Sequence, residues 1–447
     1  MTTPPPAELR DCFGRDYRVG PSAELLTGRS RSWQLVPPLA AMAAAGVLQY
    51  SFGALAPAVA ALHGWSVTQT FWLLALWIVA QAGVGLPVAY LRERGVLGPR
   101  ALLWLGAAMC LLGPVALGRA PGFSGALLGF SLLGGAGAGL VYAVSASTVA
   151  KWFPDRSAVR VSLVTGAFAC GAIPFLLFVF PAVSAANLVP ALDRTGLVLG
   201  LVIAVAGVLF RDPPPNWWPP QVDPRVWALS RRRGPGSANL PAVRDYSPAE
   251  AVRIGALPAL AVILFCASAV TLFTVAAFAG FAARLELSPP VIGAATALLV
   301  ASNGVARAVV LRVSDRIGRA RTLAATLTVL ALSQAALAAS AADRSLPLLL
   351  AAAVLAGAGG ACYPMVASLV REYFGDRRHG EIHAVVYSAK AFGGIAGVGL
   401  TAAAVPTMGY PALFLLAGAL ALSSALLCRS LRQPGRIPLL WTTQRVR

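Results

Sequence analysis

Charged residues are scarce in this sequence, and acidic ones are scarcer than basic ones. Of 447 residues, 12% are Asp, Glu, Lys or Arg, and only 17 are acidic. Soluble domains usually carry about 25% charged residues, so this composition excludes a soluble globular protein. All the acidic residues fall in predicted tails, loops or helix ends. No carboxylate is therefore expected in the interior of a predicted helix.

Signatures of chemistry are lacking as well. The six cysteines show no metal-binding or redox spacing, and no GxxxxGK[ST] phosphate-binding loop occurs. No catalytic constellation is visible either. We therefore expect no enzyme, no metal and no cofactor, and any membrane transport should be secondary and not driven by ATP.

What the chain does contain is apolar sequence. Hydrophobic residues make up 57% of it, and about 20 consecutive apolar residues are enough to cross the hydrocarbon core. Twelve such runs predict an all-α integral membrane protein with two pseudo-symmetric bundles of six transmembrane helices. The runs lie near 36–60, 70–91, 100–118, 123–149, 158–183, 191–210, 255–282, 290–311, 320–341, 345–370, 383–405 and 409–430.

An internal repeat supports this division. Four residues near the end of the fourth run recur in the second half, each 221 positions later, and repeated halves around a midplane site are typical of secondary transporters. The pairs are Tyr142 and Tyr363, Phe153 and Phe374, Asp155 and Asp376, Arg156 and Arg377. The predicted parts are an N-terminal tail (1–35), a six-helix bundle (36–210), a linker (211–254), a second six-helix bundle (255–431) and a C-terminal tail (432–447).

The net charge of +19 is explained by membrane topology. With the N-terminus assigned to the cytoplasm, 30 of the 36 Lys and Arg residues fall in cytoplasmic loops and tails, as the positive-inside rule requires. We expect a monomeric, multi-pass plasma-membrane protein with both termini cytoplasmic, embedded in lipid and without a nucleic-acid partner. Trp217 and Trp218 in the linker are expected at the level of the lipid headgroups.

Two basic residues, Arg307 and Lys390, lie alone inside predicted helices. At about 1.5 Å per residue, both lie roughly 12–14 Å from the cytoplasmic ends of their helices, hence at matching depth. A charge at membrane depth is costly and usually faces a cavity on a substrate path. Without a buried carboxylate to neutralise them, the pair predicts a pocket for an anion. The alternative is that each side chain snorkels to an interface.

Several motifs resemble those of the major facilitator superfamily. RVSDRIGRAR, after the run 290–311, resembles the cytoplasmic-loop motif of that superfamily, and AYLRERGVLGPR is its degraded first-half counterpart. YAVSASTVAKWFPDR, NGVAR and the Pro- and Trp-containing linker together resemble the oxalate:formate antiporter family, over roughly residues 36–432. A tryptophan that the family leads us to expect is replaced at Gly359 and at Tyr387.

The resemblance implies roles for individual residues. Arg307 and Lys390 would clamp the substrate carboxylates, and the aromatic and polar residues Gln49, Tyr50, Tyr142 and Tyr363 would line the cavity, although each could also be ordinary packing. Asn303 occupies the position, one turn before Arg307, at which proton-coupled monocarboxylate carriers have an aspartate. Since Asn does not titrate, that proton switch is missing.

The predicted function is therefore alternating-access exchange of small organic anions, a class of carboxylates that includes oxalate and formate. A proton-coupled monocarboxylate symporter, in which Lys390 would carry the proton, is the alternative. A ligand sensor without transport activity is a third hypothesis. Efflux of cations is disfavoured, because it would require a negatively charged cavity.

Charged turns are predicted to act as cytoplasmic gates. An acidic residue beside arginines and near a helix N-terminus can hold two halves together in one state, although each turn could instead be simply solvated. The predicted gate residues are Asp315, Arg316 and Arg319, Asp155 and Arg156, and Asp376 and Arg377.

Overall fold

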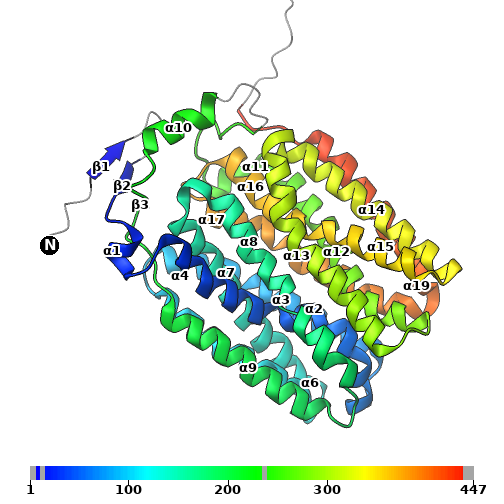
Figure 1. Ribbon diagram of the computed structural model, residues 1–447. Helices are drawn as coiled ribbons and strands as arrows, with labels where there is room; N and C mark the ends of the chain where they lie inside the picture. Colours follow the sequence, from blue (N-terminus) through cyan, green and yellow to red (C-terminus); the bar gives the residue numbers. More distant parts are fainter. Residues whose placement is uncertain (1–6, 11–15, 234–238, 436–447) are drawn as a thin grey trace, which may run out of the picture.

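Long helices make up most of the computed structural model (Figure 1), which describes residues 7–10, 16–233 and 239–435. The first half contains α2 (Val36–His63), α3 (Val67–Gly83) with α4 (Gly85–Glu93), α5 (Pro99–Arg119), α6 (Phe123–Ala126) with η2 (Leu127–Gly134) and α7 (Gly135–Trp152), α8 (Ser157–Cys170) with η4 (Phe175–Val179), and α9 (Leu188–Leu209). The second half contains α12 (Ala256–Arg284), α13 (Pro289–Ile317), α14 (Arg319–Asp343), α15 (Leu346–Ala356) with η6 (Gly357–Ala361) and α16 (Cys362–Phe374), α17 (His379–Tyr387) with α18 (Ala389–Gly394) and η7 (Ile395–Leu400), and α19 (Thr401–Leu427).

Among the described residues, 11 continuous helical segments are long and apolar enough to cross a membrane. The last of them, His379–Ser430, has 52 residues. At 1.5 Å per residue it would be about 78 Å long, more than twice the hydrocarbon thickness. Gly409 of α19 has a non-helical backbone, with φ 72° and ψ 163°, and so interrupts this segment. The segment therefore contains two spans, and the all-α fold with twelve spans is confirmed.

Local sequence explains where many helices begin. Ser66 and Gln69 form a reciprocal capping box at the start of α3. The Gln69 backbone N–H donates to the Ser66 hydroxyl at 3.1 Å, and the Ser66 backbone N–H donates to the Gln69 side-chain oxygen at 2.9 Å. Proline occupies the first turn of α5 and of α13, where its missing N–H has no intrahelical partner to lose. Both devices satisfy or remove the backbone donors that a helix N-terminus leaves free.

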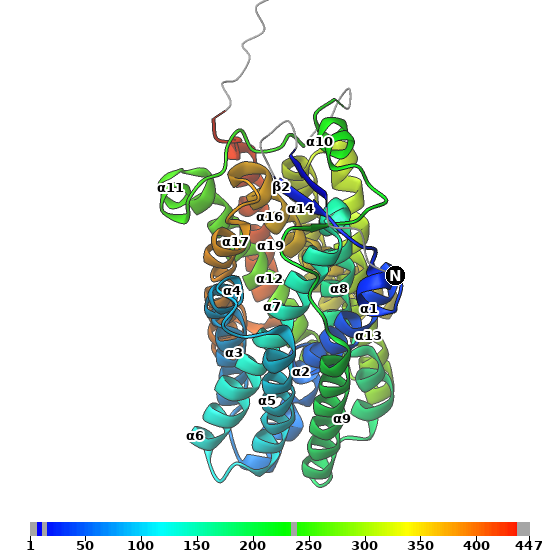
Figure 2. The ribbon, with the colours of Figure 1, turned by 90° about the vertical axis from the view of Figure 1, so that its left-hand side faces the viewer.

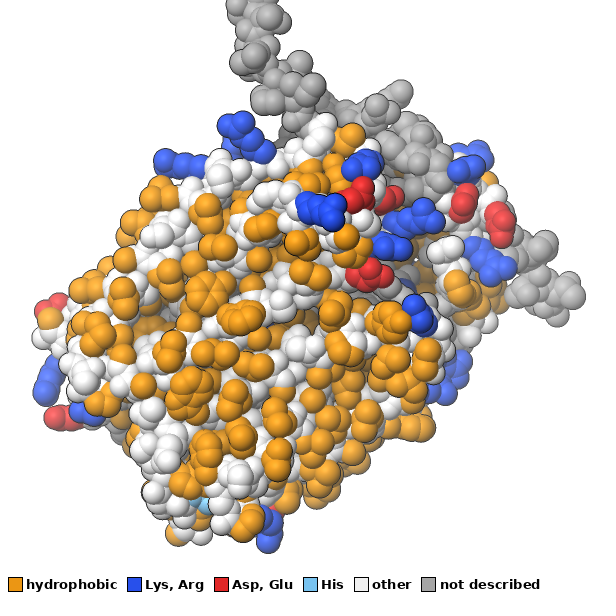
Figure 3. All heavy atoms as spheres, turned by 180° about the vertical axis from the view of Figure 1, so that it is seen from behind, with side chains coloured by type: hydrophobic (Ala, Val, Ile, Leu, Met, Phe, Trp, Pro, Cys, Tyr) orange, Lys and Arg blue, Asp and Glu red, His pale blue; other side chains and the backbone are white. Residues whose placement is uncertain are grey.

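The helices form two groups that lean against each other (Figure 1), the blue-to-green first half beside the yellow-to-red second half. Extensive contacts between the groups join α8 to α13, α3 to α18 and α2 to α12. Apolar side chains cover most of the outer surface along the helices, while charged side chains gather at its ends (Figure 3). This distribution is the one expected of helices surrounded by lipid.

A small folded cap covers one end of the bundle, which we call the linker side (Figure 2). It contains a three-stranded sheet in the order β1 (Ala7–Arg10), β2 (Asp16–Val19) and β3 (Trp217–Trp218), with β1 antiparallel to β2 and β2 parallel to β3. The short helices α1 (Ala23–Thr27), α10 (Pro224–Arg233) and α11 (Pro248–Arg253) belong to the same end. The opposite end is called the far side.

The cap overturns the placement expected for the linker tryptophans. Trp217 and Trp218 are 5% and 2% exposed, so they do not face lipid headgroups. Trp217 packs edge-on against Trp152, and Trp218 packs against Tyr17 and Trp227. The prediction was wrong because it ignored the N-terminal segment, whose strand β2 pairs with these residues. Of the predicted terminal tails, residues 1–6, 11–15 and 436–447 lie outside the described part of the chain.

Candidate functional site

Arg307 is buried on α13 and reaches across to the first half. Its guanidinium donates to the Thr165 carbonyl on α8 at 2.7 Å and to the Tyr50 hydroxyl on α2 at 2.6 Å. It also donates to the Asn303 side-chain oxygen at 3.3 Å, one helical turn away. The Tyr50 hydroxyl donates to that same oxygen at 3.3 Å. Asn303 and Tyr50 therefore hold the guanidinium in a fixed orientation between the two halves.

Lys390 is buried on α18 and also points to the first half. Its ammonium donates to the Gln81 side-chain oxygen on α3 at 2.7 Å and, more weakly, to Gln49 on α2 at 3.4 Å. A third donation, at 3.4 Å, goes to the Tyr387 hydroxyl on the preceding turn. All three acceptors are neutral, so none of them compensates the charge.

Tyr363 on α16 is shared by the two cations. Its ring centre lies 5.4 Å from the Arg307 guanidinium carbon and 5.7 Å from the Lys390 nitrogen. Phe168 and Tyr387 add further ring contacts to Lys390, at 5.9 and 5.5 Å. A cation within about 6 Å of an aromatic ring is attracted by the ring's quadrupole. The two head groups therefore project into one space, neither of them toward lipid.

Tyr142 completes the aromatic wall. It stacks on Tyr387 with ring centres 5.7 Å apart and meets Phe168 edge-on at 5.4 Å. All of the predicted substrate residues, namely Gln49, Tyr50, Tyr142, Asn303, Arg307, Tyr363 and Lys390, thus surround one region between the halves. Their roles in binding remain a prediction.

Several buried donors in this region have no acceptor among the described residues. They are Nε of Arg307, the side-chain amide nitrogen of Asn303 and that of Gln81. A buried polar group without a partner is costly, on the order of 1–3 kcal/mol. Moreover, neither Arg307 nor Lys390 makes an ion pair within the described chain. An arrangement with surplus donors and two uncompensated cations is suited to receive an anion with several acceptor oxygens.

Sequence reasoning missed several contributors, among them Phe168, whose ring lies beside Lys390. Gln81 is a lone amide in an apolar run, and that isolation is a signal that could have pointed to it. Thr165 contributes through its backbone carbonyl, so its side chain gave no signal. Tyr387 was noted only as a departure from the family pattern, yet it links Lys390 to the aromatic wall.

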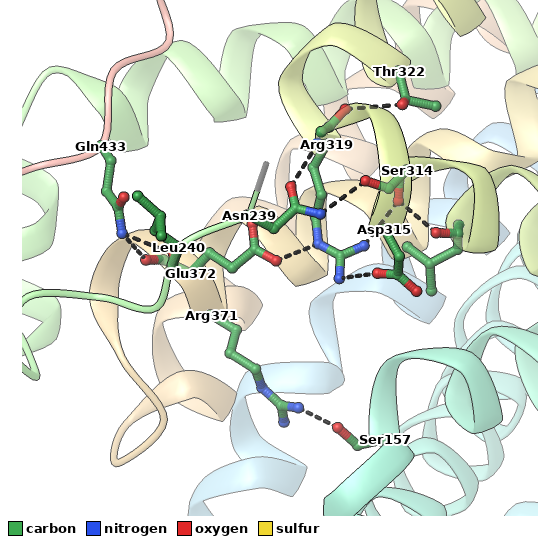
Figure 4. Close-up of polar contacts among 12 residues, drawn as sticks. Ser157, Asn239, Leu240, Ser314, Asp315, Arg319, Thr322, Arg371, Glu372 and Gln433 are labelled. Carbon is green, nitrogen blue, oxygen red and sulfur yellow. Dashed lines mark hydrogen bonds and ion pairs between the residues drawn. The ribbon is translucent and has the colours of Figure 1, made fainter. Parts of the chain in front are cut away.

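The predicted gate residues form networks on the linker side (Figure 4). Arg319 pairs with Glu372 at 2.5 Å and with Asp315 at 2.8 Å. Both partners belong to the second half, so this network holds α13, α14 and α16 together in the present conformation. Asn239 of the linker joins it by accepting from the Arg319 amide and donating to the Ser314 carbonyl, both at 2.8 Å. Arg316 is exposed.

The acidic residues of the other two predicted gates each form an ion pair within their own half of the molecule. Asp155 binds Arg31 of the N-terminal segment and lies 3.7 Å from Arg156. Asp376 pairs with Arg371 at 2.9 Å, and the amides of Asp376 and Arg377 donate to the Asp245 carboxylate of the linker. A contact between the halves is made instead by Arg371, which donates to the Ser157 hydroxyl at the start of α8 (Figure 4). Gating by the predicted residues stays a prediction.

The two ends of the interface differ. On the far side the halves touch: Thr68 donates to the Ala402 carbonyl at 3.4 Å, and Gly399 packs on the Trp72 ring. On the linker side the halves meet at Arg371 and Ser157, and a cavity of about 430 Å³ lies at this contact, lined by the α7–α8 turn, the ends of α13 and α16 and the start of α14. This conformation is therefore closed on the far side of the buried cations.

Comparisons with known proteins agree with this architecture. A sequence profile of the Major Facilitator Superfamily matches residues 259–440. The "Oxalate:formate antiporter" of Oxalobacter formigenes is 25% identical over 399 residues, which cover 89% of this chain and 90% of the relative. A crystal structure of a POT family transporter in complex with 5-aminolevulinic acid aligns with a TM-score of 0.62 at 12% identity, covering 89% of this chain and 95% of that one. At that identity the structural likeness concerns the fold alone.

The fold and these matches define the class: the protein is a multi-pass membrane protein and a secondary transporter, not an enzyme. More particularly, its second half matches the profile of the major facilitator superfamily, and the chain resembles the oxalate:formate antiporter along most of its length.

Proposed function

We propose that this protein exchanges small organic anions, carboxylates of the oxalate and formate class, by alternating access. The observation that carries the proposal is the shared position of Arg307 and Lys390, which are buried, uncompensated within the described residues and adjacent to the same Tyr363 ring. The guanidinium fork is suited to bidentate carboxylate binding, and the ammonium acts as a point charge. The resemblance to an oxalate:formate antiporter supports the same substrate class.

Exchange without protons follows from the same charges. Closing the site around two cations without an anion would require burying them without a counter-charge, which is costly. A bound carboxylate lowers that cost in either direction, so the halves, 36–210 and 255–431, would rock efficiently only when loaded. We place the protein in the plasma membrane as a monomer, with the linker side cytoplasmic as the distribution of Lys and Arg favours.

The alternative, proton-coupled symport of a monocarboxylate, is favoured by one observation. His379, His383 and Tyr387 follow one face of α17, with successive ring centres 5.7 and 5.5 Å apart, and Tyr387 accepts from Lys390. Both histidines are only partly exposed. The row connects the linker side to Lys390.

The test combines two measurements on reconstituted protein. Rapid counterflow of labelled oxalate or formate, with little net uptake into anion-free vesicles, is expected of an exchanger. Strong net uptake driven by a pH gradient alone would instead establish the symporter. In a panel of carboxylates, the anion that stabilises the folded protein against heat should lose that effect in Arg307→Gln and Lys390→Gln. Retained stabilisation in both variants would refute the proposed site.

A further inference from the structure

The cavity on the linker side is unusually basic. Arginines from both halves line it: Arg156 and Arg160 from the first, and Arg312, Arg319 and Arg371 from the second. The three carboxylates in its lining are Asp155, Asp315 and Glu372. The balance of charge in the lining is therefore positive before any local pairing is considered.

The carboxylates of the lining are already bound by close partners, although Asp315 and Glu372 share one arginine. Asp155 binds Arg31, which comes from outside the lining, and Asp315 and Glu372 both bind Arg319. Arg160 and Arg312, in contrast, make no ion pair within the described residues. Nε of Arg160 is moreover buried without an acceptor there. Two guanidiniums that line the same cavity thus lack an ion-pair partner among the described residues.

The start of α8 adds backbone donors to the same space. Ser157, Ala158 and Val159, the first residues of this 14-residue helix, line the cavity, and no side chain caps the helix. The first amides of a helix have no intrahelical acceptor, and the helix dipole favours an anion at this end. Arg371 approaches the same end from the other half through its contact with Ser157 (Figure 4).

We propose that this cavity is a second anion site, which holds a small divalent oxyanion of the dicarboxylate type between the two halves. The class of ligand rests on the proposed function, since the site would collect the transported anion before it reaches Arg307 and Lys390. Arg312 lies five residues from Arg307 on α13, about 7–8 Å along the helix. An anion released by Arg312 would therefore have a short path to the buried pair.

The experiment measures binding of oxalate, and separately of inorganic sulfate, to the purified full chain in detergent without added lipid. Chloride keeps the ionic strength constant, and thermal unfolding is followed at increasing anion concentration. The double variant Arg307→Gln with Lys390→Gln should retain a saturable stabilisation from the second site. In the double variant Arg160→Gln with Arg312→Gln, the dissociation constant of the second site should rise about tenfold. This is the loss expected when a charge-assisted contact is removed.

Arg321→Gln is the matched control, because Arg321 is exposed on α14 and does not line the cavity. It should behave as the wild type. An equal loss in this control, or a second binding event unchanged in Arg160→Gln with Arg312→Gln, would overturn the second site. If Arg160→Gln with Arg312→Gln is too unstable to purify, the single variant Arg312→Gln takes its place. Arg312 is exposed, so its replacement should not affect folding.

A transport measurement separates this inference from the proposed function. In vesicles of either orientation, Arg312→Gln should raise the KM for oxalate severalfold on the linker side and leave the far-side KM unchanged. Equal changes on the two sides would contradict a site in this cavity. If Arg307→Gln and Lys390→Gln left exchange intact, the proposed substrate site at these residues would fail, while the binding data would still decide whether the second site exists.

Discussion

At the scale of single residues, Tyr363 determines how the two cations can act together. Its ring lies within 6 Å of both head groups, and no other described ring contacts both. Arg307 is fixed by three donated hydrogen bonds, whereas Lys390 has one close acceptor and two distant ones. The guanidinium therefore provides the rigid part of the site and the ammonium the adjustable part.

This difference predicts the outcome of Arg307→Lys. The variant keeps the positive charge but loses the planar fork, so its three donors cannot serve Thr165, Tyr50, Asn303 and both oxygens of a carboxylate together. We expect the KM for exchange to rise about 10- to 100-fold, the equivalent of roughly 1.5–3 kcal/mol for hydrogen bonds to a charged group. The substitution Arg321→Lys, at an exposed residue of α14, is the control. A KM within twofold of the wild type would show that charge alone suffices.

At the scale of elements, Asp212 fastens the start of the linker to α4 and α7. It binds Arg92 at 2.5 Å, Lys151 at 2.9 Å and the Thr148 hydroxyl at 2.7 Å. Burial by itself raises the pKa of the Asp212 carboxyl. The charges of Arg92 and Lys151 and these hydrogen bonds lower the pKa by more, so that it lies below its usual value. The ionised form is therefore the one that the folded state favours.

The lowered pKa sets the direction of a pH effect. A carboxyl whose pKa is lower when folded stabilises the protein above its unfolded pKa of about 4, and that contribution is lost as the pH falls through the folded value. Asp212→Asn should lower stability near pH 7 by roughly 2 kcal/mol and flatten the loss of stability below pH 4. Thermal unfolding between pH 3 and 7 measures both effects. An unchanged pH profile would assign the acid sensitivity to other groups.

Much of the fold and part of the site could be predicted at this scale. Apolar length alone located the spans, because lipid requires each segment to satisfy its own backbone. Arg307 and Lys390 were predictable because a charge is so costly there. The strands β1–β3 were not, since pairing between residues 18 and 217 depends on contacts distant in sequence. The pairing of Arg319 with Glu372 was also missed, because Glu372 lies on α16, 53 residues further along the chain.

At the scale of the whole molecule, the two halves meet through glycines. A Cβ atom on Gly304 of α13 would lie 2.3 Å from the Cys170 sulfur and 2.7 Å from the Gly166 carbonyl oxygen of α8. Such a separation is too short for real atoms, so the two helices can approach this closely only because neither Gly304 nor Gly166 carries a side chain. This contact belongs to the conformation that is closed on the far side.

Gly304→Ala should therefore disfavour this conformation and slow exchange. We expect at least a tenfold lower exchange rate, because even about 1.4 kcal/mol of strain changes an equilibrium tenfold. Gly83→Ala is the matched control, since an added Cβ on this helical glycine would meet nothing within 4 Å. Equal rates in the two variants, measured by counterflow, would show that the α8–α13 contact does not limit transport.

The linker is attached to different halves at its two ends. Trp227 donates to the Asp155 carbonyl at 3.1 Å, which ties α10 to the first half, while Asn239 binds Arg319 and Ser314 of the second. These two anchors are 12 residues apart in the sequence, so the chain between them has a fixed contour length. Its length sets an upper limit to how far the halves can separate on this side, so removing residues from it should restrict the opening without touching any group that contacts the transported anion.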